Sequence, residues 1–150
     1  MLADESGDIA SLELSNTRSK LRRPADGEDL IHHTNCFAEP EMCAIEVPAD
    51  ATFTDRAPTP LRGKQVLKSA NCRRERLKQL LAAEPVLGPD QFQRILGDHG
   101  LTGQPSDDSL CMHSGYWNTT ASLQWFPQRR SLRVSYSSTC QANYVELQLS

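Results

Sequence analysis

The sequence predicts a mixed α+β domain, made largely of antiparallel strands with two helices. Three observations support this fold class. Stretches with a two-residue hydrophobic period lie near both ends of the chain, and stretches with a three-to-four-residue period lie in the middle. The chain also lacks the repeated strand and helix alternation that forms a parallel sheet. Its 150 residues are the usual size of one domain.

Strands are expected over residues 8–35. In residues 8–14, isoleucine and leucine stand among small or polar residues, as in a half-buried strand. Asn16-Thr17 can turn the chain so that residues 18–23 run back. After a Pro and Gly turn, residues 30–34 are expected to form a third strand.

A loop is expected over residues 39–59, because Pro40, Pro48 and Pro58 remove amide donors from any regular element. Helices are expected over residues 61–99, the first ending before Pro85 and the second beginning at Gly88-Pro89. Strands are expected again over 119–149. They follow a loop at 103–118 and comprise residues 119–126, 132–136 and 143–149, with Val145, Leu147 and Leu149 on one face.

Composition excludes several functional classes. The net charge of −3 gives no long-range attraction for nucleic acid. No stretch approaches the ~20 apolar residues of a membrane span, and the first residues lack the features of a secretion signal. Five widely spaced cysteines are typical of reduced thiols rather than of a disulfide framework. We therefore expect a soluble, cytoplasmic protein that binds neither nucleic acid nor membranes.

The segment with most chemical potential is His32-His33-Thr34-Asn35-Cys36-Phe37, at the end of an expected strand. Its residues fit three interpretations: ordinary core and surface positions of a strand end, ligands of a zinc ion, or a Cys and His nucleophile pair. Cys43 is the only further ligand nearby, and no second cluster has finger-like spacing. The sequence therefore predicts no metal and no cofactor.

The order of short motifs along the chain resembles the C-terminal part of one family. The acyl-coenzyme A:6-aminopenicillanic acid acyltransferases, or isopenicillin-N acyltransferase-like proteins, are cysteine N-terminal-nucleophile hydrolases. The motifs are Asp4-x-x-Gly7-Asp8, Arg23-Pro24-x-Asp26-Gly27, His33-Thr34-Asn35-x-Phe37, Arg76-Leu77-x-x-Leu80-Leu81, Leu96-x-Asp98-His99, Ser109-Leu110-Cys111, Thr119-Thr120-Ala121-Ser122 and Cys140 before the last strand. Together they cover nearly the whole chain.

The resemblance implies the C-terminal portion of a four-layer αββα fold. In that family an exposed N-terminal cysteine attacks an amide or thioester, and the acyl group passes to water or to an amine. It also implies that Asn35 donates its side-chain amide to the oxyanion, with His33, Thr34 and Cys36 lining the site. The implied partners are an acyl donor, either an amide or acyl-coenzyme A, and an amine acceptor.

The chain departs from the family pattern at three places. Cys36 stands where the family has a second histidine, and Met112 stands where it has an arginine. Tyr116-Trp117-Asn118 precedes Thr119-Thr120, where relatives often carry a basic residue. Met112 therefore implies the loss of a cationic partner for the substrate or for a carboxylate.

The family's nucleophilic cysteine lies upstream of the region resembled here, and none of the five cysteines replaces it by position. We therefore expect a fragment that is catalytically incomplete alone, such as a subunit completed by an N-terminal companion chain. Without that companion, apolar sheet surface should stay uncovered. Two alternatives remain open: a non-catalytic interaction protein that uses a sheet edge or the Arg73–Arg76 helix face, and a self-contained hydrolase that pairs Cys36 with His33 or His99.

Overall fold

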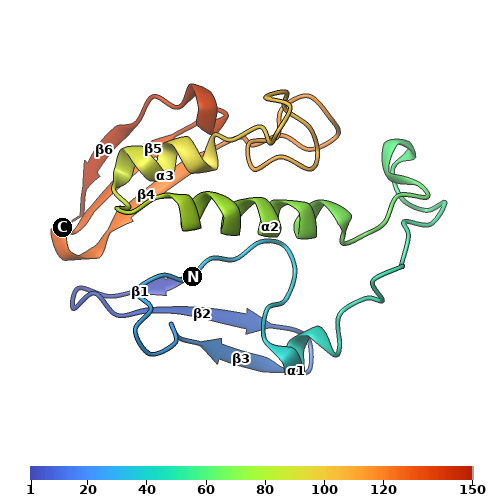
Figure 1. The fold of residues 1–150 in the computed structure, drawn as a ribbon, viewed down its shortest axis with the longest axis horizontal. Coiled ribbons are helices and arrows are strands. Elements are labelled where there is room, and N and C mark those ends of the chain that lie inside the picture. The colour runs from blue at the N-terminus through green and yellow to red at the C-terminus, as the bar shows by residue number, and fades with distance from the viewer. Residues whose placement is uncertain (150) are drawn as a thin grey trace.

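The computed structural model describes residues 1–149 and contains two separate three-stranded antiparallel sheets with helices between them. Figure 1 shows the longest helix, α2, running between the N-terminal sheet and the part of the molecule that holds α3 and the C-terminal sheet. The mixed α+β class predicted from the sequence is confirmed.

The N-terminal sheet has the order β1-β2-β3. Strand β2 (Ile9–Leu14) and strand β3 (Ser19–Arg22) form the expected hairpin, in which Leu12 lies opposite Leu21. Ser15 closes its turn, because its hydroxyl accepts the Arg18 amide at 2.9 Å. Strand β1 (Leu2–Ala3) was not predicted; at two residues it carries no hydrophobic period to detect.

The expected third strand over residues 30–34 is wrong. These residues form no ladder, and the isolated bridge between Thr34 and Cys36 is their nearest approach to strand pairing. The guanidinium of Arg22 instead donates to the His32 carbonyl at 2.8 Å, so a side chain takes the place of a strand partner. The expected loop at 39–59 also contains a one-turn helix, α1 (Pro40–Cys43), which has proline in its first turn, where a missing amide costs little.

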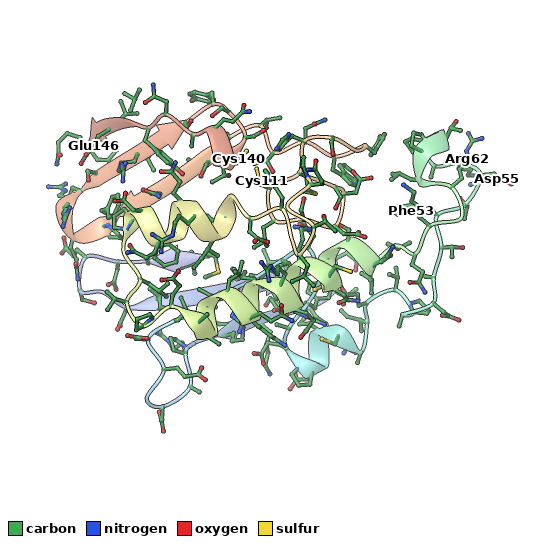
Figure 2. The ribbon with its side chains drawn as sticks, turned by 45° about the horizontal axis from the view of Figure 1, so that its top comes forward. Phe53, Asp55, Arg62, Cys111, Cys140 and Glu146 are labelled. Carbon is green, nitrogen blue, oxygen red and sulfur yellow. The ribbon has the colours of Figure 1, made fainter. Side chains whose placement is uncertain are left out.

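The first long helix begins later than expected, because α2 spans Lys68–Ala83 rather than starting at residue 61. Upstream, residues 59–61 form a 3-10 turn and Gly63 has φ +73°, a left-handed conformation that ends helical structure. The bridge between Thr52 and Gln65 then closes an arm that projects from the body in Figure 2. The second helix, α3 (Pro89–Leu96), begins where predicted.

The C-terminal sheet has the order β4-β5-β6. Its strands are β4 (Ser122–Phe126), β5 (Ser131–Ser135) and β6 (Val145–Gln148), close to the predicted ranges. A 3-10 turn (Pro127–Arg129) joins β4 to β5, and a second one (Thr139–Gln141) lies between β5 and β6.

Both sheets turn polar side chains inward and apolar ones outward. In β2, Glu13 is 3% exposed, whereas Leu12 and Leu14 are 43% and 61% exposed. In the C-terminal sheet, Gln124 is buried and contacts the start of α3 through the Pro89 carbonyl. The outward face carries exposed apolar residues of the two outer strands, each opposite Leu132 or Val134 of the central strand β5: Leu123, Trp125, Val145 and Leu147. This surface agrees with the expectation of uncovered sheet faces.

Among residues 1–149, no helix is both long enough and apolar enough to cross a membrane.

Candidate functional site

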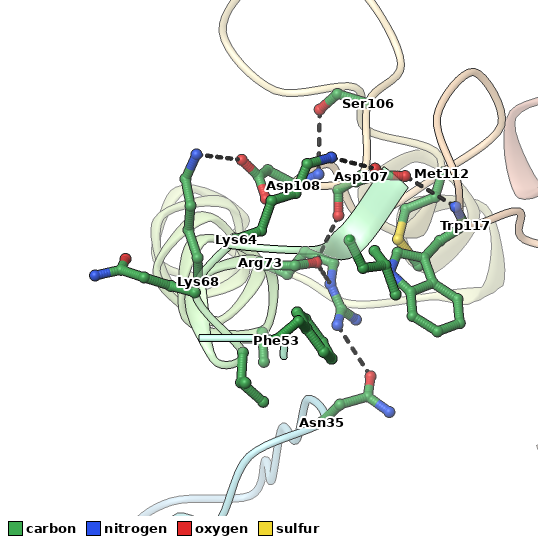
Figure 3. A pocket seen from close by; sticks show the side chains of 15 residues that line it. Asn35, Phe53, Lys64, Lys68, Arg73, Ser106, Asp107, Asp108, Met112 and Trp117 are labelled. Carbon is green, nitrogen blue, oxygen red and sulfur yellow. Dashed lines mark hydrogen bonds and ion pairs between the residues drawn. The ribbon is translucent and has the colours of Figure 1, made fainter. Parts of the chain in front are cut away.

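A pocket with a volume of about 760 Å³ lies against the N-terminal half of α2. Figure 3 shows the side chains that meet there. Asn35 comes from the extended segment before α1, Arg73 from α2, and Asp107, Met112 and Trp117 from the 103–118 loop. The pocket thus joins segments that are far apart in the sequence.

The side chain of Asn35 is oriented by Arg73. The Nη2 atom of Arg73 donates to Asn35 Oδ1 at 3.0 Å. Since a guanidinium can only donate, the amide atom facing it has to be the oxygen. The amide nitrogen of Asn35 therefore points away from Arg73, as Figure 3 shows, and among residues 1–149 no hydrogen bond occupies it. Asn35 is left with two N–H groups to offer to a ligand.

Arg73 is itself partly buried. Desolvation lowers the pKa of Arg73, while the nearby Cys36 and Asp108 act in the opposite direction. Its Nε donates to the Ser69 hydroxyl at 3.4 Å, one helical turn earlier. The guanidinium is thus held from both sides, and it brings a positive charge to the wall of the pocket.

The loop that forms the opposite wall is tied to α2. The Ser69 hydroxyl donates to the Asp107 carbonyl at 2.5 Å, and Lys68 pairs with Asp108 at 3.4 Å. The Trp117 amide donates to Asp107 Oδ1 at 2.9 Å, which closes the loop on itself. These contacts hold the loop in position around the pocket.

The other residues expected at the site lie elsewhere. His33, Thr34 and Cys36 line a separate pocket of about 180 Å³, not the large one that Asn35 lines. Thr34 donates to the Ala70 carbonyl at 3.1 Å and so joins this segment to α2. The structure therefore places only Asn35, of the four predicted residues, at the larger pocket.

His33 is bound to a buried carboxylate. Its Nε2 lies 3.2 Å from Glu13 Oε1, and the Glu13 side chain is only 1% exposed. The same carboxylate accepts the backbone amides of Ala38 and Glu39 at 2.9 and 3.2 Å. Glu13 thus fixes the chain on both sides of Asn35. Sequence reasoning missed it, because it occupies what reads as the solvent face of a strand.

Cys36 does not form the nucleophile pair that was expected for a self-contained hydrolase. Cys36 is buried, and its sulfur contacts Thr34 at 3.3 Å and Arg74 at 3.4 Å rather than a histidine. The pKa values of two other cysteines, Cys43 and Cys140, are raised, and burial is the largest cause in both cases. A raised pKa lowers the fraction of reactive thiolate. The pairing of Cys36 with His33 or His99 is therefore wrong.

The arginines of the Arg73–Arg76 face of α2, which the sequence offered as a binding surface, are engaged in contacts within the chain. Arg74 donates to the Phe37 carbonyl at 3.4 Å, and Arg76 forms a two-pronged pair with Asp98 at 2.9 and 2.7 Å. With Arg73 bound to Asn35, all three arginines contact their own chain.

His32 gives the protein a predicted sensitivity to acid. Burial first, and then the charges of Arg22, Lys78 and Arg74, lower the pKa of His32 below its ordinary 6.5. Its contribution to stability is present above the unfolded-state pKa and is lost as the pH falls through the lowered folded-state pKa. We expect His32→Gln to show a smaller loss of stability than the wild type between about pH 7 and pH 5.5, by a modest margin because the ring is partly exposed. Urea unfolding at both values measures this; equal losses in the two proteins would contradict it.

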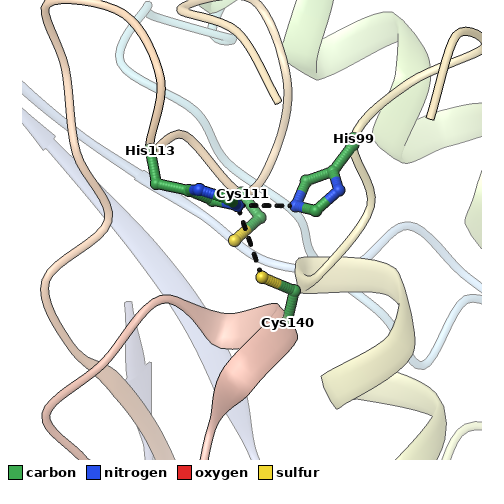
Figure 4. Close-up of side chains that lie close together, drawn as sticks. All are labelled: His99, Cys111, His113 and Cys140. Atoms are coloured by element: carbon green, nitrogen blue, oxygen red, sulfur yellow. Dashed lines mark hydrogen bonds between the residues drawn. The ribbon is translucent and has the colours of Figure 1, made fainter. Parts of the chain in front are cut away.

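A second cluster of reactive side chains lies at the C-terminal end of α3. The ligand atoms of His99, Cys111, His113 and Cys140 all lie within 4.8 Å of one another. Figure 4 shows the two imidazoles and two thiols pointing toward a common centre. His113 Nε2 lies 3.0 Å from His99 Nε2 and 3.4 Å from Cys140 Sγ. Sequence reasoning missed this cluster because its residues are too far apart to match a finger-like spacing.

No protein-family model matches this chain, and neither a curated protein nor a solved structure matches it.

Proposed function

We propose that this chain is the oxyanion-side part of a cysteine N-terminal-nucleophile acyltransferase or amidohydrolase, incomplete without its nucleophile. The observation that carries the proposal is the setting of Asn35. Its amide lies at the 760 Å³ pocket, is fixed through its oxygen by Arg73, and keeps both N–H groups for a ligand. This is the role that the motif resemblance implies for the same residue.

In the proposed reaction, a cysteine thiolate supplied by the companion adds to the carbonyl carbon of an amide or thioester. The carbonyl oxygen becomes an oxyanion, which the Asn35 amide stabilises. The α-amino group of that cysteine, which took the proton of the thiol, passes it to the leaving group, so that collapse expels an amine or a coenzyme A thiol and leaves a thioester on the cysteine. Water or an acceptor amine then takes the acyl group and restores the thiol. A hydrogen-bond donor that is already oriented toward the oxyanion stabilises the transition state without having to reorganise during the reaction.

Arg73 supports the proposal by supplying a cation where the family pattern has lost one. Met112 replaces the family's arginine, and Met112 lines the same pocket as Asn35 and Arg73. The positive charge now comes from α2 rather than from the loop. In the proposed enzyme Arg73 acts as a positioning residue, because it holds the Asn35 oxygen and so fixes the direction in which the amide nitrogen points.

The uncovered faces of the two sheets favour a companion polypeptide. Leucines of β2 and β3 and the apolar residues of β4 and β6 stand outward, while Glu13 and Gln124 on the opposite faces are buried. Exposed apolar surface of this kind is typical of an interface. A companion polypeptide that packs on these faces would bury this surface. The same faces would serve a non-catalytic interaction protein, which is the second candidate.

Isolation of the chain from its source cell tests the proposal. We expect a tagged chain to recover, in equal amount, a polypeptide that begins with cysteine, either as a separate chain or as the processed part of one precursor. Intact mass and N-terminal sequencing identify it, and iodoacetamide should label that first cysteine fastest. Recovery of unrelated proteins, without any polypeptide that begins with cysteine, would contradict the enzyme and support the interaction protein.

A further inference from the structure

We propose that His99, Cys111, His113 and Cys140 bind one zinc ion in a tetrahedral structural site. Zinc is the metal that best matches two thiolates and two imidazoles, and four protein ligands complete its coordination. The inference concerns a different place from the pocket at Asn35, and it does not depend on the proposed enzymatic function.

The distances fit a metal of this size. Zinc–sulfur bonds of about 2.3 Å and zinc–nitrogen bonds of about 2.0 Å place neighbouring ligand atoms about 3.3 to 3.8 Å apart in a tetrahedron. The two imidazole nitrogens are 3.0 Å apart, and the His113 nitrogen is 3.4 Å from the Cys140 sulfur. All four atoms fall within 4.8 Å of one another, so shifts of at most about 1 Å would complete the tetrahedron.

The local structure brings these four residues together. Arg76 clamps the Asp98 side chain, and the Asp98 carbonyl accepts the Cys111 amide at 3.1 Å, which joins the segments that carry His99 and Cys111. On the other side, Gly97 packs so closely on the turn holding Cys140 that an added Cβ would lie 3.2 Å from the Cys140 Cα. Cys111 is fully buried and Cys140 is exposed, so an ion can reach the ligands from the side of Cys140.

The site would have a structural role rather than a catalytic one. With two sulfur and two nitrogen ligands, no coordination position is left open for a substrate or for water. The ion would cross-link the end of α3, the 103–118 loop and the turn between β5 and β6. Because Met112 lies between two of the ligands and lines the large pocket, the ion would also fix one wall of that pocket.

Metal analysis of the full 150-residue chain, produced without a histidine tag in zinc-supplemented medium, is the direct test. We expect one zinc per chain by elemental mass spectrometry, and loss of most of that zinc in Cys140→Ser and in His113→Asn. Cys72→Ser changes an exposed cysteine on α2 outside the cluster and should keep the full amount. Chelation of the ion should lower the melting temperature of the wild type and of Cys72→Ser alike.

A spectroscopic measurement on the wild-type chain tests the proposal even if the variants fail to fold. Replacement of zinc by cobalt should give the intense visible absorption of a tetrahedral site together with a thiolate-to-cobalt charge-transfer band. Three results would overturn the proposal: a wild-type chain without stoichiometric zinc, a weak octahedral cobalt spectrum, or a Cys111–Cys140 disulfide in chain isolated under reducing conditions.

Discussion

Replacement of Glu13 with alanine should lower the free energy of unfolding by about 3–5 kcal/mol. The carboxylate is buried and accepts the amides of Ala38 and Glu39 as well as a contact from His33. Alanine would leave both amides without an acceptor and open a cavity. Urea unfolding followed by circular dichroism measures the loss.

Two comparisons make this prediction specific. Glu13→Gln keeps the shape and one acceptor oxygen, so its loss should be smaller, and Glu41→Ala removes only a surface ion pair with Lys20 and should change little. If Glu13→Ala does not fold, hydrogen exchange in Glu13→Gln should still be faster at the amides of Ala38 and Glu39. Equal stability of Glu13→Ala and Glu41→Ala would show that the buried carboxylate does not anchor the segment.

In the proposed assembly of this chain with a companion, Asn35→Ala should reduce kcat about 10²–10³-fold and change KM little, because an oxyanion donor acts mainly in the transition state. The measurement is steady-state hydrolysis of an amide or thioester by the chain together with its companion, or with the upstream region of an acyltransferase-like relative. Asn35→Asp should not restore the rate, since a carboxylate repels an oxyanion.

The matched control for Asn35 is Asn16→Ala, which changes an exposed asparagine in the turn between β2 and β3. It should keep the wild-type rate, and thermal unfolding of Asn35→Ala should match that of the wild type. If Asn35→Ala retains full activity while the companion is active, Asn35 has no role in stabilising the oxyanion.

Short-range patterns predicted much of the secondary structure. The β2–β3 hairpin, α3 and the three C-terminal strands lie close to their expected ranges, because each has a clear period and clear turn residues. The predictions failed where partners distant in sequence decide the outcome. Residues 30–34 have strand-like composition, but the Arg22 side chain, rather than a neighbouring strand, donates a hydrogen bond to the His32 carbonyl. Leu61 belongs to a 3-10 turn ahead of Gly63 rather than to α2.

The site was less predictable than the fold for the same reason. The motif resemblance selected Asn35, which does line the large pocket, yet nothing local to it indicated that Arg73 fixes its orientation from 38 residues away. The cluster around His99 and Cys140 unites positions from a helix end, a loop and a turn, and only the tertiary structure brings them together. The arginines of α2 read as a solvated face, although each has a partner within the chain.

In β2 the acidic Glu13 is buried and the leucines on either side of it are exposed, and this arrangement affects the register in which β2 pairs with β3. A shift of one residue would bury Leu12 and Leu14 and turn Glu13 toward water, so hydrophobic burial alone would favour the slipped pairing. The contacts of Glu13 with Ala38, Glu39 and His33 exist only in the observed register. Strand alignment in this sheet is therefore specified by one acidic side chain rather than by the leucines beside it.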